Sequence, residues 1–137
     1  MLFRSRKRNT AEALKEARKN IAFAKLNNCP TSPRKMRLIA DLIRGMDAEK
    51  ALSELKHNPK EASIRMEKLL LSALANWEAK NDGKNMDESN LYVSEVKVDS
   101  GRMLKRIQPA PQGRAHRIRK RSNHVTIVVD SREIETN

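Results

Sequence analysis

The chain has 137 residues and a mass of 15.7 kDa, which suits one domain with a modest core and is too short for two ordinary domains. Its 29 Lys and Arg outnumber its 17 Asp and Glu, and the formal net charge of +12 predicts a polyanionic partner or an anionic membrane surface. The single cysteine, Cys29, excludes an intrachain disulfide and fits a reducing compartment. No window approaches the roughly 18 apolar residues of a membrane span, so we expect a soluble, cytoplasmic protein.

Residues 1–19 are expected to form a basic N-terminal extension, disordered over residues 1–9 and briefly helical after that. The capping-box spacing of Asn9 and Glu12 indicates where this helix begins, and it should run to about residue 19. The following stretch from Asn20 to Asn28 contains three apolar side chains and could be a strand.

Three helices are predicted next. The first begins at the N-cap Ser32, which precedes a proline, and ends at Gly45. The second follows the cap Asp47 and ends near residue 58, and the third covers about residues 60–80. Their apolar side chains repeat at helical spacing and should form most of the core: Met36, Ile39, Ala40 and Ile43, then Ala48, Ala51, Leu52 and Leu55, then Met66, Leu69, Leu70, Ala73, Leu74 and Trp77.

Arg34, Lys35 and Arg37 crowd the first turns of the first helix, where the helix dipole disfavours cations. They face either a partner more negative than water or simply the solvent, and the sequence favours neither alternative. They are therefore candidates for contacts with a polyanion.

Two strands are predicted beyond the loop at residues 81–90. The first is Leu91 to Val98, whose alternation changes phase between Val93 and Val96, where a bulge could lie. The second is His124 to Val129, with alternate residues buried. The chain should fray from Asp130 onward, and we take residues 131–137 as a C-terminal tail.

The connection from Asp99 to Asn123 is the most unusual segment, because compact domains rarely carry so long a link without a use for it. Between Gly101 and Arg121 it has six Arg, two Lys and no acid, so we predict an extended β-ribbon arm inserted into nucleic acid. None of the chain's four aromatic residues lies in it, which predicts recognition of RNA shape and phosphates instead of stacked bases. Its cations are Arg102, Lys105, Arg106, Arg114, Arg117, Arg119, Lys120 and Arg121.

Several stretches also resemble the large-subunit ribosomal protein L-twenty-two family of bacteria. They are Ser32-Pro33-Arg34-Lys35-Met36-Arg37-Leu38-Ile39-Ala40-Asp41-Leu42-Ile43-Arg44-Gly45, Lys105-Arg106-Ile107, Gly113-Arg114-Ala115 through Ile118, Lys120-Arg121 and His124-Val125-Thr126-Ile127-Val128-Val129. The resemblance covers about residues 20–130 and implies an α+β fold, with three helices on a small three-stranded antiparallel sheet and a long hairpin. That segment would be a single RNA-binding domain including the arm at residues 99–123.

The resemblance also implies a function: a structural constituent of the large ribosomal subunit that binds its ribosomal RNA, bridges RNA domains during assembly and lines the nascent-peptide exit tunnel. Its partners would be that RNA, neighbouring large-subunit proteins and the nascent polypeptide, with no cofactor, no metal and no membrane. The expected RNA-binding residues are the eight arm cations with Arg34, Lys35, Arg37 and His124. The expected tunnel tip is Arg102, Met103, Leu104, Lys105, Arg106, Ile107, Gln108, Pro109, Ala110, Pro111 and Gln112, and the RNA-clamping stem is Arg114 to Arg121.

Two features depart from the family pattern. The family commonly has a basic residue after the tip proline and another before the glycine, where this chain has Ala110 and Gln112. Contacts of this chain at the tunnel wall are therefore expected to differ from those of family members that have the basic residues. The extension to Lys19 also exceeds the usual family length.

The main rival interpretation is a DNA-binding architectural protein of the nucleoid, which also uses basic arms. An enzyme is disfavoured, because the chain has no glycine-rich phosphate loop, no metal-spaced Cys and His set and no nucleophile–base pairing. A membrane-surface helix is disfavoured because the basic segment contains Pro109, Pro111 and Gly113.

Overall fold

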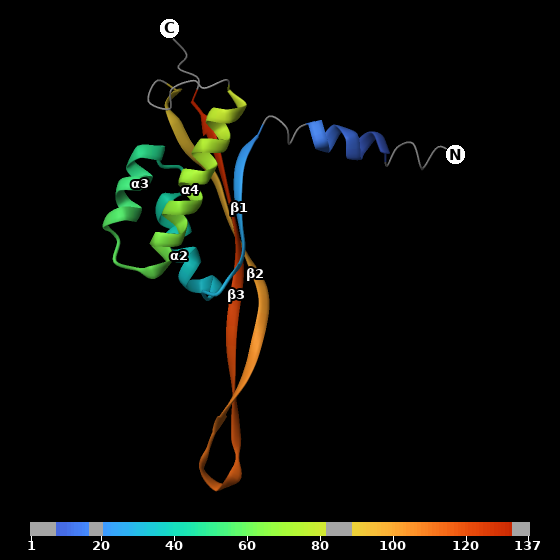
Figure 1. Ribbon diagram of the computed structural model, residues 1–137, viewed down its shortest axis with the longest axis vertical. Helices are drawn as coiled ribbons and strands as arrows, with labels where there is room; N and C mark the ends of the chain where they lie inside the picture. The colour runs from blue at the N-terminus through green and yellow to red at the C-terminus, as the bar shows by residue number, and fades with distance from the viewer. Residues whose placement is uncertain (1–7, 17–20, 82–88, 133–137) are drawn as a thin grey trace.

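A computed structural model describes residues 8–16, 21–81 and 89–132 of the chain. Helices α2, α3 and α4 lie together on one side of a three-stranded antiparallel sheet, and two of the strands continue beyond the body as a long hairpin (Figure 1). This is the α+β architecture that the sequence predicts.

The helical segment at residues 8–16 is exposed along its whole length. Arg8 and Asn9 are already helical, so the predicted N-cap at Asn9 is wrong. An ion pair one turn apart, from Arg8 Nε to Glu12 Oε1 at 2.9 Å, stabilises this earlier turn. Residues 1–7 and the expected end of the helix near residue 19 lie outside the described residues.

The three predicted helices are confirmed as α2 (Pro33–Ile43), α3 (Ala48–His57) and α4 (Glu61–Lys80). Ser32 and Asp47 stand at the N-cap positions, but neither side chain makes a capping hydrogen bond. The Asp47 carboxylate instead accepts a hydrogen bond from Lys50 Nζ at 2.8 Å. Gly45 follows α2 with φ of +77°, a conformation that favours glycine and stops the helix where predicted.

The sheet has the order β1-β3-β2, with β1 at Ala22–Cys29, β2 at Leu91–Pro109 and β3 at Ala115–Ser131. The predicted strands Leu91–Val98 and His124–Val129 are confirmed as the body portions of β2 and β3. The bulge expected between Val93 and Val96 is present, because the β2–β3 register shifts between Val93 and Glu95.

The core lies between the sheet and the helices. Every apolar position predicted on the helices is buried except Leu52, which is partly buried and packs against the core. Trp77 is 7% exposed, so it packs in the core and offers no surface for base stacking. In β1 the buried residues are Ala22, Ala24 and Cys29, while Phe23 is 42% exposed. The small side chains of this strand therefore lie in the core, while the large aromatic side chain is partly exposed, with Lys80 Nζ of α4 5.8 Å from the centre of its ring.

The chain does not fray at Asp130 as predicted. Asp130 and Ser131 pair with β2, and Arg132 is held by the body. The Arg132 guanidinium lies 4.9 Å from the centre of the Tyr92 ring and donates a hydrogen bond to Gly45 O at 3.2 Å. These contacts extend the ordered strand, and the remaining tail, residues 133–137, lies outside the described residues.

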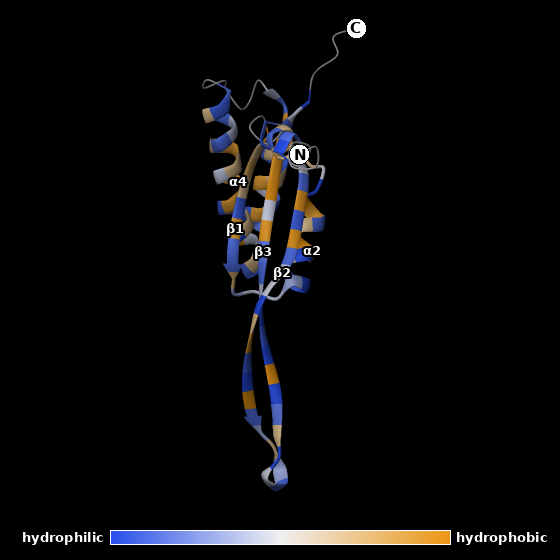
Figure 2. Cartoon of the chain, turned by 90° about the vertical axis from the view of Figure 1, so that its right-hand side faces the viewer, coloured by the Kyte–Doolittle hydropathy of each residue, from blue (hydrophilic) through white to orange (hydrophobic). Residues whose placement is uncertain are grey.

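The predicted arm is a continuous antiparallel hairpin formed by the distal parts of β2 and β3, and Figure 2 shows it as mostly hydrophilic. Its turn lies after Pro109, which pairs with Ala115. Gln112 and Gly113 have φ of +61° and +71°, and the Ala110 N–H donates to Arg114 O at 2.8 Å. The expected tip from Arg102 to Gln112 is thus too long, since its residues up to Pro109 form one strand of the stem.

Candidate nucleic-acid interface

The root of the arm is fixed to the body by a buried polar contact. Asn123 is fully buried, and its Nδ2 donates a hydrogen bond to Thr31 O in the turn before α2. On the neighbouring strand, a Cβ added at Gly101 would lie 2.7 Å from Ser122 Oγ and 3.2 Å from the Ser122 carbonyl carbon. Glycine permits this close approach at the second bulge of the β2–β3 ladder, between Ser100 and Met103.

This root was missed by the sequence reasoning. A glycine inside a strand signals a close backbone approach or a bulge, so Gly101 could have indicated it. Asn123 gave no comparable signal, because its partner Thr31 is 92 positions away in the sequence. The structure therefore adds a joint between the arm and the first turn of α2.

The cations of the arm are divided between its two faces. Directly opposed residues share a face, so the register Met103↔Arg121, Lys105↔Arg119 and Ile107↔Arg117 defines one face, which we call the Arg121 face. The pairs Leu104↔Lys120, Arg106↔Ile118 and Gln108↔His116 define the other, the Lys120 face. The Arg121 face thus has four cations and the Lys120 face has two.

All eight arm cations are exposed, and none forms an ion pair with any residue that the structure describes. In the body, by contrast, some cations are paired with a carboxylate, namely Arg44, Lys50, Arg65, Lys97 and Arg132. Lys105 and Arg119 even stand directly opposite each other, an arrangement that is unfavourable between like charges. The arm has positive charge that the protein itself leaves uncompensated.

The basic turn of α2 lies beside the root of the arm. Asn123 belongs to the same alternate set of β3 residues as Arg121, so near the root the Arg121 face continues the helix-covered side of the sheet. Arg34 and Lys35 are exposed on the first turn of α2. Arg37 Nη2 donates to Val98 O of β2 at 3.3 Å. The predicted cations of α2 and of the arm are therefore brought together where the arm leaves the body.

His124 is placed differently from the other predicted RNA-binding residues. It is half-buried, and its Nδ1 accepts a hydrogen bond from the Asn28 N–H at 3.0 Å. Asn28 has φ of +53° beside the irregularity at the end of β1, so His124 stabilises this turn. Its role in the described structure is to join β1 to β3 near the root.

Apolar residues also lie on the arm. Leu104 is 51% exposed and Ile107 is 73% exposed, on opposite faces of the ribbon. Such side chains have no core to join, so they can pack against sugars, bases or a polypeptide. The turn itself, from Ala110 to Gly113, has no charged side chain.

Other kinds of site find no support among the described residues. They include no group of three His, Cys, Asp or Glu side chains that could hold a metal ion. None of the described helices is long and apolar enough to cross a membrane. The interface consists of exposed cations on an extended hairpin.

Comparison with known proteins identifies close relatives. The family model described as Ribosomal protein L22p/L17e matches residues 24–130. The protein named Large ribosomal subunit protein uL22 from Christiangramia forsetii is 68% identical over 124 residues, which cover 90% of this chain and 92% of the relative. Proteins of the same name from Flavobacterium johnsoniae and Porphyromonas gingivalis are 68% and 61% identical, with coverage of 90% of each chain for the first and 97% and 98% for the second. The last match spans 133 of the 137 residues, so it includes most of the N-terminal extension.

Proposed function

The chain belongs to the ribosomal protein L22p/L17e family and is a structural, non-enzymatic constituent of the large ribosomal subunit; from this premise we propose that its arm binds the subunit's ribosomal RNA and bridges RNA domains during assembly. One observation carries the proposal. All eight arm cations are exposed and have no acidic partner among the described residues, and six of them are divided between the two faces of a ribbon that extends beyond the core. A ribbon with cations on both faces can neutralise phosphates of two RNA segments at once.

Binding by this surface depends on the shape of the RNA and on the positions of its phosphates. Arginine has a planar fork of donors that contacts phosphate oxygens in pairs, and six of the eight arm cations are arginines. The basic turn of α2, with Arg34 and Lys35, adds contacts at the root. Together the arm and the first turn of α2 form one basic surface that contacts the RNA backbone. The hydrogen bond from Asn123 to Thr31 holds the root of the arm beside this turn.

The turn of the hairpin has a separate role in the proposal. Residues 110–113 reach the wall of the nascent-peptide exit tunnel, where an uncharged turn gives a passing polypeptide little to adhere to. Ala110 and Gln112 stand where the family commonly has basic residues, so this wall is less positive than in relatives that keep them. The body and arm, about residues 20–130, act as one RNA-binding unit in the cytoplasm, with residues 1–19 as a basic extension and residues 131–137 as a tail.

The structure suggests how the arm can be deleted to test the proposal. Gly101 and Ser122 lie side by side at the root, so an Asn-Gly turn can replace residues 102–121 without opening the body. Cells should make the full chain or this variant, and lysates should be sedimented through high-salt sucrose gradients. We expect the full chain to remain with large subunits, and the folded variant to accumulate in incomplete particles.

Two outcomes would contradict the proposal. One is normal assembly of large subunits around the folded, armless variant. The other is release of the full chain to the top of the gradient together with recovery on DNA, which would favour a nucleoid protein. Circular dichroism of the purified variant provides the control, because a variant that unfolds would mean that the arm is needed for the body itself.

A further inference from the structure

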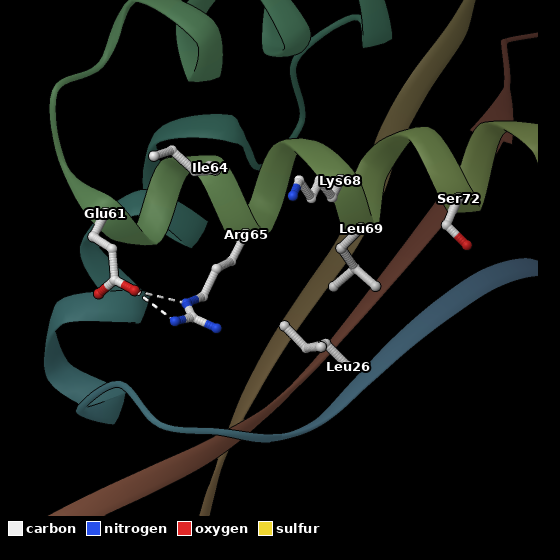
Figure 3. Close-up of a pocket in the computed structure, with 7 residues that line it drawn as sticks. All are labelled: Leu26, Glu61, Ile64, Arg65, Lys68, Leu69 and Ser72. Carbon is white, nitrogen blue, oxygen red and sulfur yellow. Dashed lines mark hydrogen bonds and ion pairs between the residues drawn. The ribbon is translucent and has the colours of Figure 1, made fainter.

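A groove runs along the body between α4 and the edge strand β1, and Figure 3 shows its lining. It has a volume of about 500 Å³, within the roughly 300–1,000 Å³ of typical binding clefts. Leu26 lines it from β1, and α4 contributes Ile64, Arg65, Lys68, Leu69 and Ser72. None of these residues belongs to the basic surface of the arm or of α2.

The groove has an apolar floor and a defined end. Leu69 and Leu26 point toward each other across it (Figure 3). Arg65 Nη2 lies 2.6 Å from Glu61 Oε1, and this ion pair closes one end. Ile64 also lines the groove and is 55% exposed, so it adds apolar surface beside the floor.

The hollow continues along β1 toward its beginning. A second depression shares Ser72 with the first and is lined also by Phe23, Lys25 and Lys80. Phe23 is 42% exposed there. The two hollows together make an elongated channel beside the strand, a shape that suits an extended chain better than a compact ligand.

The edge of β1 is closed over only part of this length. Within the described residues β1 pairs with β3 alone, so its other edge faces the groove. Lys80 Nζ donates to Ile21 O at 2.6 Å, and Asn76 Nδ2 donates to Phe23 O at 3.0 Å. Backbone groups of alternate residues point to the same edge, so the next such position is Lys25, where no described side chain of α4 makes a comparable bond. This short stretch beside the apolar floor can receive an added strand.

The charged side chains beside the apolar floor indicate which kind of molecule fits the groove. Lys68 lines the groove and Lys25 lines the second depression, and neither forms an ion pair with any described residue. The one acid of the groove's lining, Glu61, is engaged by Arg65. Phosphates of RNA would satisfy the two lysines, but they would leave Ile64 and the leucine floor in contact with water. A polypeptide that has both an apolar side chain and a carboxylate satisfies the floor and the two lysines together.

We propose that the groove between α4 and β1 docks an extended segment of a neighbouring protein of the large subunit. An apolar side chain of that segment packs on Leu26 and Leu69, and a carboxylate lies between Lys25 and Lys68. The proposal rests on the chain's place in the large subunit and does not depend on RNA binding by the arm.

The test uses intact large subunits assembled with the full chain. The photoreactive residue p-benzoylphenylalanine replaces Ile64, which is exposed in the lining of the groove, and purified subunits are irradiated and analysed by mass spectrometry. We expect a crosslink to a single protein, at a segment with apolar and acidic residues. A crosslink to RNA instead, or none, would overturn the proposal.

A charge change tests the same contact independently. Lys68→Glu should abolish the crosslink, because it places a carboxylate against the partner's carboxylate. Lys56→Glu, an equal change at an exposed position on α3 outside the groove, should leave it unaffected. Equal crosslinking in both variants would refute the assigned occupant. Because Lys68→Glu leaves the arm unchanged, the affinity of the free protein for ribosomal RNA should stay the same, which separates this proposal from that for the arm.

Discussion

Neutralising three arginines on one face of the arm should reduce the salt dependence of RNA binding by a predictable amount. Arg117, Arg119 and Arg121 lie on the Arg121 face, all exposed and without acidic partners among the described residues. Each can therefore engage one phosphate, and replacing all three with Gln removes three such contacts while keeping the length and polarity of the side chains.

The magnitude follows from counterion release. The logarithm of the binding constant falls with the logarithm of salt concentration by about 0.7 to 0.9 per phosphate neutralised. If the eight arm cations each engage a phosphate, a fourfold rise in salt should weaken binding by about 2,000-fold to 20,000-fold. With five contacts left, the same rise should weaken it by only about 100-fold to 500-fold.

The assay is filter binding or fluorescence anisotropy with large-subunit ribosomal RNA. The salt concentration is raised fourfold, from about 50 to about 200 mM. A matched control replaces Lys50, Lys56 and Lys60 with Gln, which changes the net charge equally but on α3 and the turn after it. The arm variant should show the smaller slope, and the control should keep that of the unmodified protein. Equal slopes in the two variants would mean that net charge, and not contact by the arm, drives binding.

Three further experiments probe the root of the arm, the beginning of α3 and the pairing of the two arm strands. Asn123→Ala should lower the free energy of unfolding by about 1–3 kcal/mol, because it leaves the buried Thr31 carbonyl without its donor; an unchanged denaturation midpoint would contradict this. The hydrogen bond and charge of Lys50 hold the pKa of Asp47 below its ordinary value of 3.8, so its stabilising effect is present above pH 3.8 and is lost as pH falls through the lower, folded-state pKa. Asp47→Asn should therefore melt below the unmodified protein at pH 5, with the difference narrowing toward pH 3, and a difference independent of pH would argue against the pairing. Lys105→Glu should increase amide protection in the free arm, because it places a carboxylate opposite Arg119, yet it should weaken RNA binding; a parallel change in both measurements would refute the reasoning.

The body of the fold was predictable because its signals are local and repeat. The apolar residues of α4 recur at helical spacing, and Leu70 and Ala73 are buried as that period requires. The end of α2 followed from Gly45 for a similarly local reason, since a positive φ favours glycine. The family resemblance then indicated how these helices and strands are arranged, which periodicity alone does not give.

Features that depend on distant partners were not predictable. Asp130 and Ser131 looked like a fraying end, but pairing with β2 extends the strand through them. Likewise, the charge of the arm is visible in the sequence but its register is not, so the predicted tip began too early in the chain. Register depends on the bulge between Ser100 and Met103, which shifts every later cross-strand pair. The division of cations between two faces could only come from the structure.

The arm shows a conflict between folding and function that explains why it is attached as it is. Like charges face each other at Lys105 and Arg119, and Ile107 is mostly exposed, so the ribbon gains little stability from its own side chains. The arm is ordered from its root, where Asn123 bonds β3 to Thr31 of the body and Gly101 lets β2 lie close to Ser122 of β3. In the proposed complex, phosphates of the RNA would relieve the repulsion between like charges along the ribbon. Affinity for RNA and order in the arm would therefore be coupled in that complex, because phosphates would neutralise the cations that repel one another in the free ribbon.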